Sequence, residues 1–377
     1  MFTIAAVILG PLYFSLAILF LWGTFRERRE RKEKTQRSFV SIVIAAKDEQ
    51  TNIGRCLDSL LAQNYPGDKF DIFVVDDCSE DCTAEIVRTY TARLPKIHLL
   101  QAKSPPEDLP GKQHALAVGI EGSGGEIILT TDANCTASPE WISKTATLFS
   151  PEVGLVAGFT LLEAKGLFAK LQCLDLLYLL TIGWGATGIG KPTSAMGKNL
   201  GFRRKAYEEV GGYQRIGFTL NEDLALLKAI HDTHRWRIRF IAEPAQTTTA
   251  SPAKTFPEFL SQRKRWTLAG LKIISRFGQF VLVTVFCSRI LVITLLLLSP
   301  LRGDYLRLAA TVFLVTSLSD FLILFRSIVR LKRKDLLKYS PLMFPFQLFY
   351  QSIVGTLVLL GRRQFYWRGR NYKVPLV

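Results

Sequence analysis

The sequence lacks the residue patterns that several kinds of site require. Its six cysteines form no Cys-x-x-Cys pair and its four histidines are scattered, which argues against a structural zinc site. We expect the cysteines to be buried or unreactive thiols in a reducing compartment. No nucleic-acid recognition motif accompanies the net charge of +16, so the basic balance needs another explanation.

The start of the chain lacks the features of a cleaved signal peptide. No basic residue precedes its first apolar run, and no small-residue cleavage site follows it. Residues 2–23 instead form an uncharged run of about the 20 residues that cross a bilayer as a helix. We therefore expect an uncleaved membrane anchor over residues 1–24, followed by a basic linker over residues 25–37.

Long apolar runs return in the last third of the chain, in a sequence that is 48% hydrophobic. Residues 278–299 and 305–325 are predicted to span a membrane. Residues 341–361 are a further candidate, although two prolines interrupt its start. The region 278–361 is therefore predicted to be a C-terminal membrane region with two or three spans.

Basic residues gather beside these runs, which is the positive-inside pattern of membrane proteins. The pattern predicts an integral protein of a bacterial cytoplasmic membrane, with a membrane surface and no nucleic acid as its partner. If residues 341–361 span the membrane, the basic tail over 362–377 lies outside the cytoplasm, which the positive-inside pattern disfavours. Residues 341–361 are therefore either a span or a re-entrant or interfacial segment. The clustered residues are Arg26, Arg28, Arg29, Arg31, Lys32, Lys34, Arg37, Arg326, Arg330, Lys332, Arg333, Lys334 and Lys338.

Between the apolar runs, residues 38–255 alternate strand and helix patterns. Continuous β-branched runs predict buried parallel strands, and helical stretches separate them. This order predicts an α/β domain with a mostly parallel, doubly wound sheet. The predicted strands cover residues 38–46, 70–77, 96–102 and 126–133, and the predicted helices cover residues 51–62, 83–92 and 111–122.

Carboxylates follow three of these predicted strands, in the stretches "AAKDEQ", "VVDDCS" and "TTDAN". Ligands of such sheets bind beyond the carboxyl ends of the strands, so these side chains are expected at one edge. Crowded like charges need a cation or a hydrogen-bonding ligand to offset them. A helix N-cap explains one such aspartate, but three strands in succession favour a functional site.

Four motifs occur in order: "VVDDCS", "TTDAN", "NEDLALL" (221–227) and "QRKRW" (262–266). On these motifs the chain resembles membrane-bound family 2 glycosyltransferases of the GT-A fold, a Rossmann-like domain with a mostly parallel sheet. The resemblance covers about residues 38–270. It implies inverting transfer of a sugar from a nucleotide sugar, expected to be UDP-linked, to a lipid or lipid-proximal glycan acceptor.

The resemblance also implies which residues hold the donor. The nucleotide-sugar site would comprise Ala45, Lys47, Glu49, Asp76, Asp77, Lys112 and Asp132. "TTDAN" stands where the family has a DxD motif, which binds Mg²⁺ or Mn²⁺. Here Asp132 and Asn134 are the implied metal ligands, and the uncharged amide implies weaker metal binding by the free protein.

In the same family, the carboxylate of the "NEDLALL" segment is the catalytic base, which implies Asp223 with Glu222 beside it. Gln262 belongs to the Gln-x-x-Arg-Trp element, where Arg265 would offset charge on the leaving diphosphate and Trp266 would offer a ring face to a sugar. Residues 256–277 also read as an interfacial amphipathic helix, and both readings can hold. The resemblance places Gly197, Asn199 and Arg203 on the acceptor side.

Other interpretations remain open. A processive polysaccharide synthase shares all four motifs. A non-catalytic scaffold that binds a nucleotide sugar predicts the loss of chemical residues, and only Asn134 points that way. Transfer to polyprenyl phosphate needs no strong base, and enzymes of that kind often lack the Gln-x-x-Arg-Trp element. The presence of "QRKRW" therefore disfavours this interpretation.

The stretch "GATGIGKPT" (185–193) is not a P-loop, because Pro192 replaces the Ser or Thr that holds magnesium. The tail stretch "FYWRGRNYKV" (365–374) either approaches the diphosphate or anchors the chain at the interface. Protein partners are not indicated.

Overall fold

The computed structural model describes residues 2–26, 38–103, 109–361, 364–367 and 370–373. It divides into two compact units, which the chain enters alternately. The sheet unit comprises residues 28–163 and 194–251, and the helical unit comprises residues 1–27, 164–193 and 252–377. The continuous domain expected over 38–255 therefore differs from the structure, where residues 164–193 belong to the helical unit. The expected basic linker and C-terminal tail lie for the most part outside the described residues.

The sheet unit is built on a seven-stranded sheet of order β3-β2-β1-β4-β8-β6-β9. Its first four strands are parallel, as predicted, with Ala46 of β1 level with Asp76 of β2. β8 is antiparallel to both β4 and β6, and β9 is parallel to β6. The strands are β1 (Val40–Ala46), β2 (Phe70–Asp76), β3 (Ile97–Gln101), β4 (Ile127–Thr130), β6 (Val153–Gly158), β8 (Leu200–Arg203) and β9 (Arg237–Ile241).

The segments between the strands form helices, because their apolar residues recur at helical spacing. In α2 (Ile53–Leu61) the buried residues Ile53, Leu57 and Leu60 lie on one face, against strand residues such as Ile42 and Ile44. The other helical elements are α3 (Thr83–Thr91), α4 (Lys112–Gly122), α5 (Trp141–Ala146), η1 (Gly197–Asn199), α7 (Arg204–Glu209), α8 (Gly212–Ile216), α9 (Glu222–Asp232) and η2 (Pro244–Gln246). A second, three-stranded sheet joins β5 (Cys135–Ala137), β10 (Thr248–Ala250) and β7 (Thr160–Leu162).

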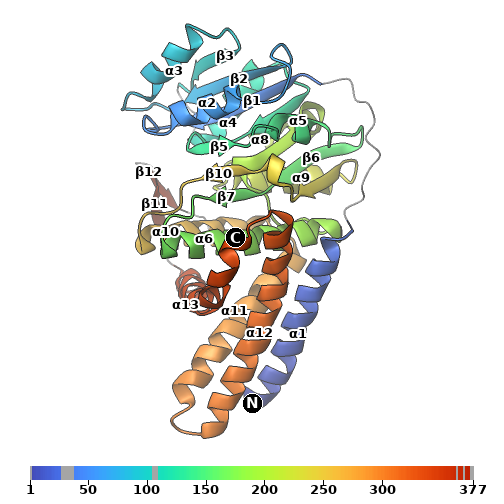
Figure 1. The fold of residues 1–377 in the computed structure, drawn as a ribbon, viewed down its shortest axis with the longest axis vertical. Coiled ribbons are helices and arrows are strands. Elements are labelled where there is room, and N and C mark those ends of the chain that lie inside the picture. Colours follow the sequence, from blue (N-terminus) through green and yellow to red (C-terminus); the bar gives the residue numbers. More distant parts are fainter. Residues whose placement is uncertain (1, 27–37, 104–108, 362–363, 368–369, 374–377) are drawn as a thin grey trace. The chain divides into compact units, whose positions relative to one another are not determined.

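The helical unit contains five helices of the described chain that are long and apolar enough to cross a membrane. Figure 1 shows α1, α11 and α12 side by side, with α6 and α10 running across one end of them. α13 packs against α6, α10 and α11. The elements are α1 (Phe2–Gly23), α6 (Leu167–Gly188), α10 (Phe256–Ile273), α11 (Arg276–Leu298), α12 (Gly303–Arg330), η3 (Lys334–Tyr339), α13 (Ser340–Leu359), β11 (Gln364–Trp367) and β12 (Arg370–Lys373).

Ring and guanidinium contacts show which ends of α1, α11 and α12 lie together. Phe2 contacts Tyr305 at one end of the group, with ring centroids 5.8 Å apart. At the other end, Arg326 Nε donates to Thr24 Oγ1 over 3.1 Å, and Phe20 contacts Phe277. α1 and α12 therefore run in the same direction and α11 runs in the opposite one.

Glycines bring α1 and α6 into backbone contact. A Cβ on Gly185 would lie 2.2 Å from the carbonyl oxygen of Phe20, and one on Gly23 would lie 2.0 Å from that of Gly185. Gly188 meets Gly23 in the same way, at 2.0 Å. Two of these glycines belong to "GATGIGKPT", so this stretch is the glycine contact of a helix pair, the use that small residues have between membrane helices.

We predict that Gly185→Ala lowers the midpoint of thermal unfolding of the detergent-purified protein. The added methyl group meets backbone, which cannot move aside, and such overpacking costs about 1–3 kcal/mol. Gly10→Ala is the control, because a Cβ there meets only Val315 at 3.9 Å. Equal midpoints for the two variants would contradict the glycine contact.

Candidate active site

Lys112 lies between two carboxylates at the carboxyl edge of the parallel strands. Its Nζ is 2.8 Å from Asp132 Oδ1 and 2.7 Å from Glu222 Oε1. Lys112 begins α4 and Glu222 begins α9, while Asp132 follows β4. Burial disfavours the ammonium charge, but the two carboxylates outweigh it and raise the pKa of Lys112 above its usual range. Lys198 also faces Asp132, with its Nζ 3.8 Å from Oδ2.

Asp223 is held beside this charge cluster by backbone donors. The N–H of Gly197 donates to Oδ2 and the N–H of Leu224 donates to Oδ1, each over 2.7 Å. Burial and the charge of neighbouring Glu222 raise the pKa of Asp223 to about 7, although Lys112 and the two N–H groups act in the opposite direction. A carboxylate with such a pKa can accept a proton near neutral pH, which is what a general base must do.

Gly197 brings its backbone unusually close to the charged groups. A Cβ on this residue would lie 3.2 Å from Lys112 Nζ and 3.3 Å from Glu222 Oε1. The carbonyl oxygen of Gly197 accepts a hydrogen bond of 3.0 Å from Thr130 Oγ1, which ties η1 to the end of β4. The predicted importance of Gly197 therefore has a structural basis in its backbone N–H and in the missing side chain.

The loops after β1 and β2 are joined by side-chain hydrogen bonds. The N–H of Asp48 donates to Ser79 Oγ over 3.0 Å, and the N–H of Glu80 donates to Asp48 Oδ1 over 2.9 Å. Asp48 and Cys78 both have positive φ, at 52° and 57°, which is a strained backbone state for such residues. Strain of this kind is found at ligand sites, where the surrounding structure maintains it.

The predicted nucleotide residues lie along these two loops. Asp76 and Asp77 are buried at the end of β2, and Asp76 Oδ1 accepts from the N–H of Ser79 over 3.2 Å. Lys47 Nζ donates to the carbonyl oxygen of Cys78 over 3.2 Å. Glu49 is also buried and accepts from Asn52 Nδ2, and Ala45 is level with Val75 in the sheet. The structure thus gathers these predicted residues at one edge of the sheet.

Two residues expected on the acceptor side are used by the fold instead. The Asn199 side chain is buried, accepts from Trp141 Nε1, and donates to the carbonyl oxygens of Phe159 and Gln246, each over 2.8 Å. Arg203 pairs with Ile127 at the start of β4, because β8 is antiparallel. Its side chain donates to the carbonyl oxygens of Val153, Phe149 and Ser150 and pairs with Glu126, at the opposite edge from Asp132.

The "QRKRW" residues lie in α10 of the helical unit, where Arg263, a residue that the motif does not specify, pairs with a buried carboxylate. Arg263 is buried, donates to Gln262 Oε1 over 2.8 Å, and lies 4.5 Å from the ring centroid of Trp266. It also pairs with Asp175 of α6. A lone aspartate in the apolar stretch "LQCLDLLYLL" was a sequence signal for this pair, because buried charges are rarely unpaired.

We predict that Asn199→Ala destabilises the protein because the indole N–H of Trp141 loses its acceptor and the carbonyl groups of Phe159 and Gln246 each lose a donor. Loss of a partner that leaves a buried group unpaired costs about 1–3 kcal/mol, so the thermal midpoint should fall clearly. Asn134→Ala is the matched control, since its side chain is half-buried and accepts only a weak contact of 3.6 Å from Cys135 Sγ. A fall in midpoint for Asn134→Ala alone would contradict these assignments.

Comparison with solved structures agrees with this architecture. The mannosyltransferase PcManGT from Pyrobaculum calidifontis, solved in complex with GDP-Man and Mn²⁺, matches 96% of this chain and 100% of its own, with a TM-score of 0.62. The sequence identity is 17%, so the likeness shows the fold alone. It confirms the predicted GT-A type of α/β domain.

Curated relatives are glycosyltransferases. Glycosyltransferase AglE of Haloferax volcanii is 32% identical over 121 residues, which are 32% of this chain and 38% of the relative. Probable glycosyltransferase YdaM of Bacillus subtilis is 29% identical, over 64% of this chain and 57% of its own length. The chain thus spans less than two thirds of either relative. The beta-monoglucosyldiacylglycerol synthase of Trichormus variabilis is 25% identical, over 92% of this chain and 76% of the relative.

The family model that matches describes nearly the whole chain. It extends over residues 2–376, and so includes both the sheet unit and the helical unit. The resemblance to membrane-bound glycosyltransferases is confirmed, and the particular family is now specified. The chain belongs to glycosyl transferase family 21.

Proposed function

We propose that this protein transfers a sugar from a nucleotide sugar, UDP-linked, to a lipid or lipid-proximal glycan acceptor, with inversion, at the cytoplasmic face of a membrane. The observation that carries the proposal is Asp223. It is a carboxylate with a pKa of about 7 at the carboxyl edge of the sheet, beside Lys112 and the Asp132 loop. This arrangement supplies a base and a cation within one site.

The donor would lie along the loops after β1 and β2. Asp76 and Asp77 would hold the base and ribose, with Lys47 and Glu49 lining the same pocket. The diphosphate would lie near the start of α4, where the helix N–H groups and Lys112 favour an anion. Donor binding would then draw Lys112 from its pairing with Asp132 and Glu222 toward the phosphates.

A divalent metal fits this site only together with the donor. Among the described residues, no group of three His, Cys, Asp or Glu side chains is placed to hold a metal ion. Asp132 faces two ammonium groups, and Asn134 offers an uncharged oxygen. Diphosphate oxygens and water can complete the coordination of Mg²⁺ or Mn²⁺ by Asp132, and the bound ion would then offset charge on the leaving diphosphate. The neighbour PcManGT, which was solved with Mn²⁺, supports this expectation.

Asp223 would activate the acceptor. The acceptor hydroxyl gives its proton to the carboxylate as its oxygen attacks the anomeric carbon. The bond from that carbon to the diphosphate oxygen breaks, and one displacement inverts the configuration. Lys112 would offset charge on the departing diphosphate, a role that the family resemblance also gives Arg265, while the N–H groups of Gly197 and Leu224 hold Asp223 in place.

The helical unit supports a membrane-facing acceptor. We infer that α1, α11 and α12 span the bilayer, because they lie side by side, while α6 and α10 run across one end of them (Figure 1). The ends near α6 and α10 carry Arg26, Arg276, Arg326 and Arg330, and by the positive-inside pattern these ends would lie in the cytoplasm.

A lipid acceptor is favoured over a growing polysaccharide by one finding. One relative, aligned over 92% of this chain, is named a beta-monoglucosyldiacylglycerol synthase, an enzyme that makes a glycolipid. The scaffold alternative is disfavoured, because Asp132, Asp223 and the "QRKRW" residues are all present.

The direct test uses membranes that carry the wild type, Asp223→Asn or Asp232→Asn. Radiolabelled UDP-glucose, UDP-galactose, UDP-N-acetylglucosamine and GDP-mannose are supplied with Mg²⁺, Mn²⁺ or a chelator, and label is partitioned between organic solvent and precipitable aqueous material. We expect label in the organic phase that falls about 100-fold or more in Asp223→Asn. Asp232→Asn, an exposed change on the same helix, should match the wild type. Label in long aqueous chains would indicate a polymer synthase. Transfer that Asp223→Asn leaves intact would exclude Asp223 as the base.

The pH dependence of transfer follows from the pKa of Asp223. A base must be deprotonated, so kcat/KM should rise with pH, reach half its maximum near pH 7, and level off above it. Because the charge of Lys112 lowers this pKa, Lys112→Met should move the midpoint to higher pH. Lys228→Met, an exposed change on α9, should leave the midpoint in place. An unmoved midpoint in Lys112→Met would contradict the coupling.

A further inference from the structure

Three side chains of α10 meet at Arg263. Its Nη1 donates to Gln262 Oε1 over 2.8 Å, and its guanidinium carbon lies 4.5 Å from the ring centroids of both Trp266 and Phe259. Because the amide oxygen of Gln262 accepts from Arg263, the amide nitrogen of Gln262 points away from Arg263 and can donate to another acceptor. The contact with Trp266 covers one face of the indole and determines which face can meet a sugar. The orientation of both motif residues therefore depends on where the guanidinium lies.

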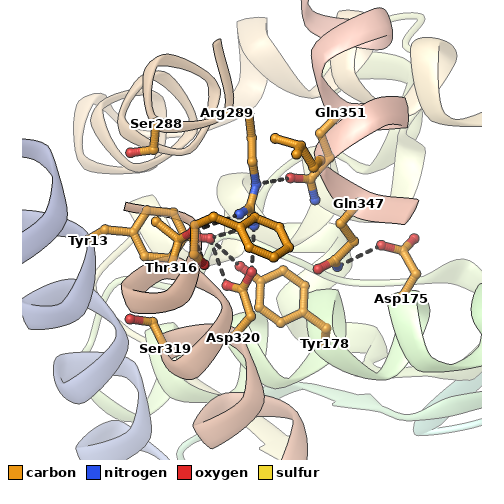
Figure 2. Close-up of polar contacts among 12 residues, drawn as sticks. Tyr13, Asp175, Tyr178, Ser288, Arg289, Thr316, Ser319, Asp320, Gln347 and Gln351 are labelled. Atoms are coloured by element: carbon orange, nitrogen blue, oxygen red, sulfur yellow. Dashed lines mark hydrogen bonds and ion pairs between the residues drawn. The ribbon is translucent and has the colours of Figure 1, made fainter. Parts of the chain in front are cut away.

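Asp175 of α6 holds the Arg263 guanidinium in position. Its Oδ2 accepts from Arg263 Nε over 3.0 Å and from Nη2 over 2.8 Å. Its Oδ1 accepts from Gln347 Nε2 over 3.0 Å and from the Tyr350 hydroxyl over 2.6 Å, both on α13. Figure 2 shows the contact between Gln347 and Asp175. One carboxylate thus joins α6, α10 and α13.

The pair is almost fully removed from water, with side-chain exposures of 5% for Arg263 and 0% for Asp175. Burial of two charges lowers the free energy of unfolding through lost hydration, and well-packed apolar residues of similar volume often stabilise a protein equally well or better. What an apolar pair does not supply is a directed set of hydrogen bonds. Four donors converge on Asp175, so the guanidinium plane has one favoured position.

We propose that Asp175 is a positioning residue for sugar transfer, which orients Gln262 and Trp266 through Arg263. The proposal rests on the proposed function, in which the "QRKRW" element acts on the donor or acceptor. Asp175 itself touches neither substrate. Its role is to hold α10 in the one arrangement that presents the Gln262 amide and the Trp266 indole in a fixed orientation.

The helical unit contains a second buried pair that serves as a matched control. Arg289 Nη2 lies 2.5 Å from Asp320 Oδ2, and both side chains are at most 1% exposed. The Tyr13 hydroxyl donates to Asp320 Oδ1, and Thr316 and Gln351 accept from Arg289 (Figure 2). This pair joins α1, α11, α12 and α13, and its partner Tyr13 also meets Tyr178 of α6. Within the described part of the chain, the hydrogen bonds of Arg289 and Asp320 do not involve α10.

The two networks approach each other at two places, and at one of them the Tyr13 hydroxyl lies 3.2 Å from the Tyr178 hydroxyl of α6. At the other, Gln351 Nε2 lies 3.4 Å from the Tyr350 hydroxyl, at the limit of a hydrogen bond. A disturbance at Asp320 should therefore reach α10 weakly. Asp320→Asn removes the same kind of buried charge as Asp175→Asn, and the two variants should lose similar thermal stability.

The kinetic test compares Asp175→Asn, Asp320→Asn and the wild type as full-length protein in detergent, with the donor that the transfer assay identifies. We expect kcat to fall about 10- to 100-fold in Asp175→Asn, because a small misplacement of binding groups costs this much, with the KM for the donor nearly unchanged. Asp320→Asn should stay within about threefold of the wild-type kcat. Equal loss of kcat in both variants would overturn the proposal, since it would indicate a general loss of structure.

A double variant separates orientation from stability. Asp175→Leu with Arg263→Met removes both charges, so the thermal midpoint should recover part of what Asp175→Asn loses, although Gln347 and Tyr350 lose their acceptor. The kcat should stay low, because nothing then directs Gln262 and Trp266. Recovery of kcat together with stability would overturn the proposal.

Amide hydrogen exchange gives a readout that does not depend on activity. Asp175→Asn should increase deuterium uptake in peptides from α10, whereas Asp320→Asn should not. If the wild type transfers no sugar, the proposed function fails, and the exchange data still decide the role of Asp175. Unchanged uptake in α10 of Asp175→Asn would overturn that role in either case.

Discussion

The charge of Lys112 is the interaction on which the candidate active site depends. Three carboxylates, those of Asp132, Glu222 and Asp223, arrive at one edge from a strand end and a helix start. Without a cation between them, their mutual repulsion would favour protonation or a more open arrangement. Lys112 contacts two of them, and its position at the start of α4 leaves it facing the region beyond the strands. The same charge can therefore stabilise the free protein and then serve a bound diphosphate.

The parallel half of the sheet could be predicted because its strands are buried on both faces. Residues such as Ile42, Val74 and Leu129 read as continuous apolar runs, and the carboxylates that follow them mark the strand ends. The antiparallel β8 could not be predicted in this way. Its direction is set by pairing with β4 and β6, which lie far from it in the sequence. The family resemblance gave Arg203 an acceptor-side role, whereas the antiparallel pairing puts it level with Ile127, at the opposite edge from Asp132.

The helical unit shows a different limit of sequence reasoning. α6 escaped prediction as a candidate span because Gln172, Asp175 and its glycines lower its mean hydropathy to 1.3, against 2.4 for α1. These residues are the ones that pack and pair inside the unit, since 67% of its most apolar stretch is buried. The contacts of Asn199 within the fold could not be predicted for a related reason. A motif position shows that a residue matters, but only the set of hydrogen-bond partners shows whether it serves the fold or a ligand.

The interruption of the sheet unit by residues 164–193 bears on how the protein is made. A ribosome delivers β1 to β7 first, then the apolar helix α6, and only afterwards β8, which lies between β4 and β6. The central sheet therefore stays open at β4 until α6 has left the exit tunnel. During that interval the edges of β4 and β6 are exposed and able to pair wrongly. Packing of α6 against α1, which precedes it in the chain, removes apolar surface of α6 from competition with those edges, so assembly of the helical unit and closure of the sheet are linked steps of one folding process.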